Sequence, residues 1–342
     1  MKIRYKTLRI RVKRPFAISR DVTIEKETVI VEIEHDGTVG YGEAIPYPYY
    51  GDHIGAVKGF IELAIPMIES EFSDPFDIRA IENKLHELAG RNYPGKAGII
   101  NALYDLIGKK LGIPVWKLIG VHKTPIRTSY TIGLGEIDEM VRDLCDHPDF
   151  QVYKIKLGTD RDYEIIKAIR EATDKPIRVD ANAAWQPREA LRKIEFMAEL
   201  GGVEFVEQPL APTDYEGLKF LKERSPLPIV VDESVLTSHD IPRLIGLTDG
   251  INIKLAKSGG ILEALRMIEI ARAHNLQIML GCMVETGLGV AAAAQVAPLV
   301  DFVDLDGNIL LAEDPFEGLP VENGFIHLSD EPGLGVRPGA GY

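Results

Sequence analysis

The sequence predicts an α/β protein, a modified (β/α)8-type TIM barrel with an α+β capping domain at its N-terminus. Three observations predict this fold. After residue 125, short β-branched runs alternate with amphipathic helical segments, which is typical of βα units and a parallel sheet. Charged residues follow most of these runs, as at the C-terminal face where barrel enzymes place their chemistry. Before residue 126, alternating strand patterns come first and helical patterns follow.

We expect residues 1–125 to form the capping domain. Alternation of apolar and polar residues predicts strands over 3–18, 28–34 and 39–44. The loop that follows, 46–51, is rich in tyrosine, glycine and proline. Helical patterns are then found over 54–70, 76–89 and 96–110, before a connector over 111–125.

We expect residues 126–307 to form the barrel. Residues 308–342 are a Gly/Pro-rich tail that we expect to pack back toward the capping domain. The tail would replace the last barrel helix. An open doubly wound sheet is the alternative, which is disfavoured because no Gly-x-Gly-x-x-Gly follows any strand. The barrel strands are predicted over 127–133, 152–157, 177–182, 203–208, 228–233, 250–255, 277–282 and 302–306. The helices are predicted over 136–146, 161–173, 187–200, 214–224, 239–247, 260–274 and 286–297.

The overall composition narrows the class of protein. A net charge of −13 argues against nucleic acid or an anionic membrane as the partner. No apolar run approaches the roughly 20 residues of a membrane-spanning helix, and the N-terminus lacks a secretory segment. The two cysteines, Cys145 and Cys282, have no metal or redox spacing, which favours a reducing compartment. We therefore expect a cytoplasmic protein, and we expect it to form a homo-oligomer.

Two lysines mark the second barrel strand. Lys154 and Lys156 are two positions apart in a β-branched run, so their side chains point to the same side. Like charges in one pocket lower the pKa of each other, and a lysine with a lowered pKa can abstract a proton. When the pair is taken alone, an edge strand with exposed lysines is the better explanation, and only the rest of the chain favours a catalytic role.

Acidic residues end three successive strands. Asp180, Glu207 and Asp232 are separated by 27 and 25 positions, each about one βα unit. Polar strand ends that meet solvent explain one or two such residues, but not three beside lysines. Three converging carboxylates repel one another unless a cation lies among them, and a carboxylate-rich site suits Mg²⁺.

The lysines and acids together predict a reaction. Lys156 on the second strand and Lys254 on the sixth would face each other across the acids. A substrate carboxylate bound to the metal then places its α-carbon between two lysines. One lysine removes the α-proton while the metal stabilises the enediolate, and the other returns a proton to the opposite face. This two-base 1,1-proton transfer is racemisation or epimerisation.

These residues resemble the motifs of the enolase superfamily, in its muconate-lactonizing-enzyme subgroup. The motifs are Lys154-Ile155-Lys156, Asp180-Ala181-Asn182, Val206-Glu207-Gln208-Pro209, Asp232-Glu233-Ser234 and the run from Asn252 to Gly260. The resemblance implies that Asp180, Glu207 and Asp232 bind Mg²⁺ and that Lys156 and Lys254 are the acid/base pair. Lys257 is the rival to Lys254, but the motif spacing favours Lys254.

Within the subgroup, Asp304-Leu305-Asp306 resembles the Asp-x-Asp of dipeptide epimerases. The resemblance implies a clamp for the free α-ammonium of an L-Ala-Xaa dipeptide that is epimerised at its C-terminal residue. It also implies that Lys154 contacts the substrate carboxylate. The remaining implied substrate contacts are Thr131, Cys282 and Val284, and the implied specificity loops contain Arg20, Tyr47 and Tyr49.

Two alternatives stay open. N-succinylamino-acid racemase and o-succinylbenzoate synthase activities use the same lysines and metal, but they have no use for an anionic clamp. A non-catalytic barrel would need a broken site, whereas every motif position is filled. The side chain at the epimerised residue is not determined by the sequence.

Overall fold

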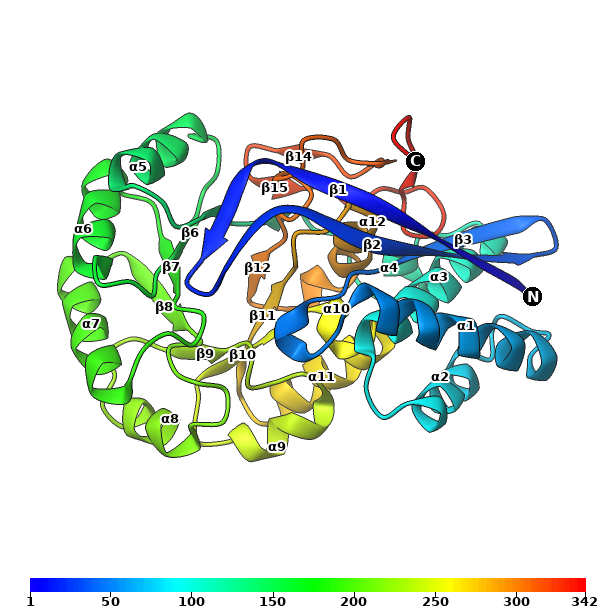
Figure 1. The fold of residues 1–342 in the computed structure, drawn as a ribbon, viewed down its shortest axis with the longest axis horizontal. Coiled ribbons are helices and arrows are strands. Elements are labelled where there is room, and N and C mark those ends of the chain that lie inside the picture. The colour runs from blue at the N-terminus through cyan, green and yellow to red at the C-terminus, as the bar shows by residue number, and fades with distance from the viewer.

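The computed structural model describes residues 1–342 and contains the expected parallel barrel (Figure 1). Eight strands lie in one sheet in sequence order from β5 to β12, which excludes the doubly wound alternative. The ring closes where Thr128 bridges Val303. The strands are β5 (Tyr130–Ile132), β6 (Tyr153–Lys156), β7 (Ile177–Asp180), β8 (Val203–Glu207), β9 (Ile229–Val231), β10 (Gly250–Ile253), β11 (Gln277–Gly281) and β12 (Phe302–Asp304).

Barrel strands form here because short β-branched segments are covered on both faces. In β9, Ile229, Val230 and Val231 are all fully buried, as expected for a parallel strand between a barrel interior and a helix layer. Each observed strand is shorter than its predicted range, and β6, β7 and β8 end on the charged residues Lys156, Asp180 and Glu207. The C-terminal ends of the strands therefore bring these charged residues together.

Helices follow the strands on the outside of the ring. No helix follows β12, as the Gly/Pro-rich tail suggested. The short helix α10 (Leu255–Ser258) was not expected. A strand was predicted to continue to residue 255, but β10 ends at Ile253 and the helix begins at Leu255. The helices are α5 (Ile137–Asp146), α6 (Asp162–Ala172), α7 (Pro187–Leu200), α8 (Tyr215–Lys222), α9 (Ile241–Leu244), α10 (Leu255–Ser258), α11 (Ile261–Ala273) and α12 (Gly287–Ala294).

The capping domain is an antiparallel sheet covered by helices. Its strands are β1 (Lys2–Ile18), β2 (Asp21–His35) and β3 (Thr38–Ala44), and a 3-10 helix η1 (Pro48–Tyr50) follows. Its helices are α1 (Ile54–Glu71), α2 (Ile78–Leu88), α3 (Tyr93–Leu111) and the short α4 (Val115–Leu118). Helix α3 packs so closely on β3 that a Cβ at Gly42 would lie 2.6 Å from the Ala102 nitrogen.

The β1–β2 hairpin is longer than predicted. Strand β2 begins at Asp21 instead of residue 28, because pairing with β1 resumes beyond a bulge and continues from Phe16 to Ile18. The far end of the hairpin lies across the barrel (Figure 1), and Leu134 after β5 donates its N–H to the Ala17 carbonyl. The hairpin therefore brings capping-domain residues over the strand ends.

The tail, residues 308–342, contacts both parts of the molecule. Leu334 donates its N–H to Asp105 of α3, 2.8 Å away, and the Tyr342 ring packs edge-on against Tyr41 of β3. The tail also contains the short strands β13 (Phe316–Glu317), β14 (Val321–Glu322), β15 (Phe325–Ile326) and β16 (Arg337–Pro338), and β15 pairs with β4 (Ile126–Arg127). These contacts join the barrel to the capping domain.

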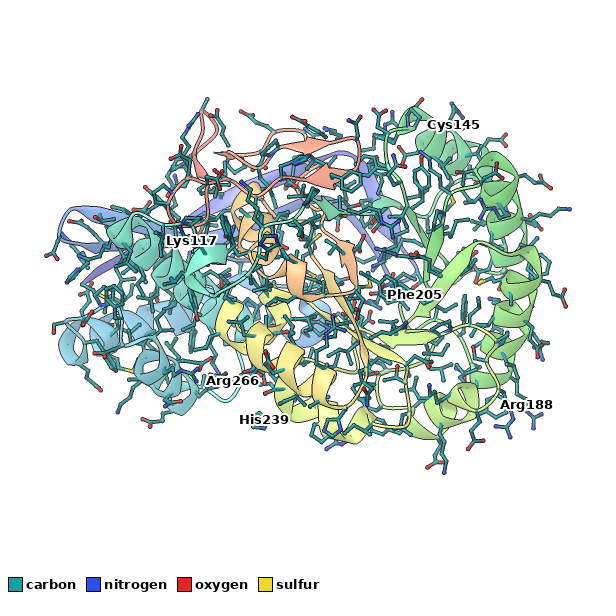
Figure 2. The ribbon with its side chains drawn as sticks, turned by 180° about the vertical axis from the view of Figure 1, so that it is seen from behind. Lys117, Cys145, Arg188, Phe205, His239 and Arg266 are labelled. Atoms are coloured by element: carbon teal, nitrogen blue, oxygen red, sulfur yellow. The ribbon has the colours of Figure 1, made fainter.

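Two remaining expectations concern the cysteines and membrane-spanning helices. Both cysteines are free thiols, and Cys145 is exposed on α5 at the outside of the barrel (Figure 2). No helix has the length and apolar character needed to cross a bilayer.

Candidate active site

A cavity lies where the C-terminal ends of the barrel strands meet the capping domain. Lys154, Lys156, Asp232 and Lys254 line it, together with residues of β1, β2 and η1. A larger cavity lies beside it between β1, β5 and α5, but that cavity contains none of the predicted lysines or metal-binding acids. The smaller cavity is therefore the candidate active site.

The lysines of β6 are inside a network of carboxylates. Lys154 Nζ lies 2.7 Å from Glu207 Oε2, 2.8 Å from Asp304 Oδ2 and 3.1 Å from Asp180 Oδ2. Lys156 Nζ donates to Asp180 Oδ2 at 2.6 Å. Both lysines and all three acids are buried, so these charges have little access to water. The structure thus brings the predicted residues of β6, β7, β8 and β12 together.

Carboxylates set the pKa of Lys154. Burial lowers this pKa, but Asp304, Glu207 and Asp180 more than offset burial, so the pKa is raised well above its ordinary value. The expectation that the neighbouring lysines lower the pKa of each other is wrong for Lys154, because three carboxylates surround its ammonium group. Lys154 therefore stays charged and is suited to bind an anion, not to take a proton.

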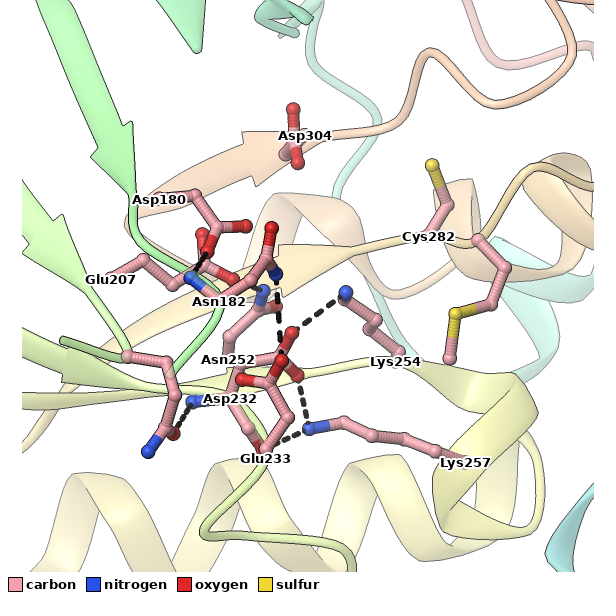
Figure 3. A network of polar contacts seen from close by, with 12 residues as sticks. Asp180, Asn182, Glu207, Asp232, Glu233, Asn252, Lys254, Lys257, Cys282 and Asp304 are labelled. Carbon is pink, nitrogen blue, oxygen red and sulfur yellow. Dashed lines mark hydrogen bonds and ion pairs between the residues drawn. The ribbon is translucent and has the colours of Figure 1, made fainter. Parts of the chain in front are cut away.

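Lys254 and Lys257 have different environments, although they are three positions apart. Lys254 lines the cavity, and its Nζ lies 2.8 Å from Asp232 Oδ2. Lys257 is on α10 and donates to Asp232 Oδ1 and to the carbonyls of Asp232 and Val235, at 2.5 to 2.8 Å (Figure 3). These three bonds use the whole donor capacity of Lys257. Lys254 therefore faces the cavity, whereas Lys257 does not.

Two residues that the sequence motifs contained, but to which no role was given, position the acids. Gln208 accepts the backbone N–H groups of Asp232 and Ser234, and Asn252 donates to Glu207 Oε1 at 2.7 Å. Gln208 has a φ of +36°, a conformation that costs a non-glycine residue about 1–3 kcal/mol. The sequence signal for Asn252 was its position two residues before Lys254, which places both on one side of a strand.

The three acids have the chemistry of a divalent-cation site. Glu207 Oε2 and Asp232 Oδ2 are buried and accept no hydrogen bond, because the lysine nitrogens within 2.8 Å are poorly aligned with them. As the side chains stand, no three His, Cys, Asp or Glu residues are arranged to hold a metal ion, because ammonium groups lie between the acids. A cation would compete with those ammonium groups for the same oxygens, and a hard, oxygen-preferring ion suits them.

The two aspartates after Val303 differ in their partners. Asp304 accepts from Lys154, Ser129 and Thr131, so its charge is already paired. Asp306 lines the cavity and accepts the Thr131 N–H at 2.6 Å, but no lysine or arginine contacts it. Burial and the neighbouring Asp304 raise the pKa of Asp306 to about 7. Asp306 is therefore the carboxyl group of the pair that has no cationic partner.

The other predicted contacts on the barrel side lie in the cavity wall. Thr131 is at the end of β5, and Cys282 and Val284 follow β11. Cys282 is not a nucleophile in this setting, because burial and the aspartates nearby raise the pKa of its thiol well above the ordinary value.

Of the predicted specificity residues, two line the cavity and one does not. Arg20 and Tyr47 are in the wall, but the second tyrosine ring there belongs to Tyr50 and not to Tyr49. The 3-10 turn of η1 places Tyr49 at the surface, 42% exposed, with its ring 3.8 Å from the Arg20 guanidinium. Arg20 also donates to Glu233 at 2.5 Å and to the Asn182 carbonyl at 2.7 Å. Lys26 of β2 lines the cavity as well, which the sequence analysis missed.

Comparison with known families identifies the chain. The model for the N-terminal domain of mandelate racemase / muconate lactonizing enzyme matches residues 2–120, and the model described as enolase C-terminal domain-like matches residues 136–340. The chain belongs to this family of the enolase superfamily. The resemblance inferred from the sequence motifs is confirmed.

Several relatives in this family are epimerases. The L-Ala-D/L-Glu epimerase of Bacteroides thetaiotaomicron is 39% identical over 98% of this chain and 88% of its own length. The dipeptide epimerase of Enterococcus faecalis, solved with Mg and L-Leu-L-Tyr, has a TM-score of 0.94 at 34% identity, with 98% of each chain covered. The L-Ala-D/L-Glu epimerase of Bacillus subtilis, solved with a substrate bound, has a TM-score of 0.95 at 32% identity, covering 99% and 100%. The expectation that this protein is an enzyme of the isomerase class is confirmed.

A racemase also shares the fold. The N-succinyl Arg/Lys racemase of Bacillus cereus has a TM-score of 0.92 at 27% identity, with 99% of this chain and 96% of that chain covered. The fold alone therefore does not separate the dipeptide epimerases from the N-succinyl amino acid racemases, and the side chains of the cavity must do so.

Proposed function

We propose that this protein is a Mg²⁺-dependent epimerase of L-Ala-Xaa dipeptides that inverts the C-terminal residue. The observation that carries the proposal is Asp306, a cavity-lining carboxylate with no cationic partner, on the same cavity as Lys156 and Lys254. A buried anion without a partner is costly unless a cation pairs with it. The α-ammonium of a dipeptide supplies that cation.

The two lysines divide the proton transfer. Lys156 extends from β6 and Lys254 follows β10, so the strands of the acids lie between them. A substrate α-carbon between the two Nζ atoms loses its proton to one lysine as a base. The other lysine, as an ammonium group, donates a proton to the opposite face, which inverts the centre. In the reverse direction the two lysines exchange roles.

Asp180, Glu207 and Asp232 would hold the Mg²⁺ in this proposal. When bound, the ion would supply positive charge beside the substrate carboxylate. Lys154, which keeps its charge, contacts the same carboxylate from the β6 side. Gln208 and Asn252 keep Asp232 and Glu207 in position through the hydrogen bonds described above.

The alternative substrate class is N-succinylamino acids, supported by the likeness to the Bacillus cereus racemase. Such substrates carry an amide in place of the free ammonium. Their binding would leave the Asp306 carboxylate buried without a cation, and the negatively charged succinyl group would be repelled by it. The geometry therefore favours the dipeptide over the acylated amino acid.

Mass-spectrometric exchange of the α-hydrogen in D₂O tests the proposal. The protein with Mg²⁺ is incubated with a library of L-Ala-Xaa dipeptides and, separately, with N-succinyl amino acids. We expect one deuterium at the C-terminal α-carbon of at least one dipeptide group, lost when a chelator removes the metal. Exchange from N-succinyl amino acids with none from any dipeptide would contradict the proposal.

A further inference from the structure

All but one of the cationic side chains that line the cavity are paired with a carboxylate. Lys154, Lys156, Lys254 and Arg20 each form an ion pair with a buried carboxylate. Lys26 lines the same cavity and has neither a hydrogen bond nor an ion pair in the structure. It is the cationic counterpart of Asp306 on the capping-domain side.

Lys26 reaches the cavity because of the long β1–β2 hairpin. It lies on β2 opposite Ile10 of β1, and its Nζ is 4.7 Å from the centre of the Tyr47 ring. Burial and the nearby Lys254 lower the pKa of Lys26 to about 8, while Asp21 and Glu285 oppose this change. At neutral pH Lys26 is therefore mainly an ammonium group, partly removed from water and without an anion in contact.

Arg20 is the other capping-domain cation in the wall, and its guanidinium is already used. It donates to the Glu233 carboxylate and to the Asn182 carbonyl, and it stacks on Tyr49. Recruiting Arg20 to a ligand would break a 2.5 Å ion pair and leave Glu233 buried and unpaired. Arg20 thus anchors the hairpin turn to the barrel.

We propose that Lys26 is a specificity-determining residue and that it binds an acidic side chain, glutamate or aspartate, at the epimerised residue of the dipeptide. This inference rests on the proposed function, in which Asp306 binds the ammonium group and the metal site binds the α-carboxylate. The side-chain carboxylate is the third charge of the substrate, and Lys26 is the cation left for it. The bond between them is charge-assisted, and Lys26 is half-buried where it would form.

An apolar side chain is the competing ligand. Phe16, Ile18, Val284 and Leu310 also line the cavity and offer it contacts. An apolar side chain, however, would exclude water from the Lys26 ammonium group and give it no partner, which is unfavourable. An acidic side chain can pack its methylene groups on the apolar residues and pair its charge with Lys26.

The test compares two substrates of the same shape and different charge. The kcat/KM for epimerisation is measured with L-Ala-L-Glu and with L-Ala-L-Gln for the wild type and for Lys26→Met. We expect the wild type to prefer glutamate. The Glu/Gln ratio of kcat/KM should fall by about 10- to 100-fold in Lys26→Met, the loss of a charge-assisted hydrogen bond.

Three further variants separate charge from shape and position. Lys26→Arg keeps the charge and should retain most of the glutamate preference. Lys2→Met removes an exposed lysine of β1 that is outside the cavity, so its Glu/Gln ratio should equal that of the wild type. Arg20→Met should lower kcat/KM for both substrates together, because it releases the hairpin turn and not a substrate contact.

The outcomes are distinguishable. A wild type that prefers L-Ala-L-Gln or an apolar dipeptide, or a Glu/Gln ratio unchanged in Lys26→Met, overturns the inference and leaves the proposed function in place. A ratio that falls in Arg20→Met instead assigns the recognition to Arg20 and also overturns it. Absence of exchange from every dipeptide contradicts the proposed function and overturns this inference with it.

Discussion

Asp304 and Asp306 are two positions apart and point into the same region, yet their partners give them different roles. Asp304 is fixed by Lys154, Ser129 and Thr131 and helps to keep Lys154 charged. Asp306 has only neutral donors. A substrate ammonium group therefore gains most from Asp306, while Asp304 holds the neighbouring residues in place.

The pKa of Asp306 gives a pH profile for the reaction. Because burial and Asp304 raise this pKa to about 7, much of the free enzyme carries a neutral Asp306 at pH 6. We expect kcat/KM for a dipeptide to rise with pH through about 7 as Asp306 ionises. It should then fall as the substrate amine, with a pKa of about 8, loses its proton.

The Asp306→Asn variant tests that assignment. It keeps the shape and removes the charge, so kcat/KM should drop by about 10- to 100-fold and the acidic limb of the profile should disappear. Steady-state kinetics between pH 5.5 and 9 measure both effects. An Asn variant that retains the wild-type acidic limb would show that another group titrates there.

At the scale of elements, the N-terminus of α12 joins the capping domain to the barrel. Glu43 of β3 accepts the N–H groups of Thr286 and Gly289 and the Thr286 hydroxyl. Glu285 lies beside it, since a Cβ at Gly289 would be 2.5 Å from Glu285 and 2.8 Å from Glu43. Two buried carboxyl groups this close share a proton more readily than they both ionise.

This pair makes stability depend on pH. Burial and the nearby Glu43 raise the pKa of Glu285 to about 8, compared with about 4.3 in an unfolded chain. Between these values the folded protein binds more protons than the unfolded one, so the free energy of unfolding falls as pH rises. We expect the melting temperature of the wild type to fall from about pH 5 to about pH 8.

Glu285→Gln should flatten that decline, because the amide cannot ionise. Asp306 contributes to the decline with the same sign. The quantity to compare is therefore the difference in melting temperature between wild type and variant at each pH. Glu199→Gln, a change on the exposed face of α7, is the matched control and should follow the wild-type curve. Equal slopes for wild type and Glu285→Gln in calorimetry would refute the role of the pair.

At the scale of the whole molecule, the sequence predicted the barrel and the convergence of its charged strand ends. That prediction was possible because most of the β-branched runs are short and end in a charged residue, as in Lys154 to Lys156 and at Asp180. In the structure Lys254 lines the cavity, whereas the chain turns helical at Leu255 and directs Lys257 away from it.

The capping-domain contribution was less predictable. Lys26 fell outside the predicted strand, because β2 continues past Thr28 through regular pairing with β1, in which Lys26 lies opposite Ile10. Tyr49 was predicted as a specificity residue, but η1 is helical and changes the direction of successive side chains, so Tyr50 lines the cavity instead. The raised pKa of Lys154 depends on carboxylates from three other strands, which a single run of sequence does not specify.

The central claim is that Lys156 and Lys254 serve opposite faces of one α-carbon. Lys156→Ala and Lys254→Ala are each incubated in D₂O with the L,L and the L,D epimer separately, and α-hydrogen exchange is followed by mass spectrometry. We expect each variant to lose epimerisation by at least about 10²- to 10⁴-fold, with residual exchange from one epimer only, and a different epimer for each variant. Epimerisation near the wild-type rate in either variant, or exchange from the same epimer in both, would contradict the account.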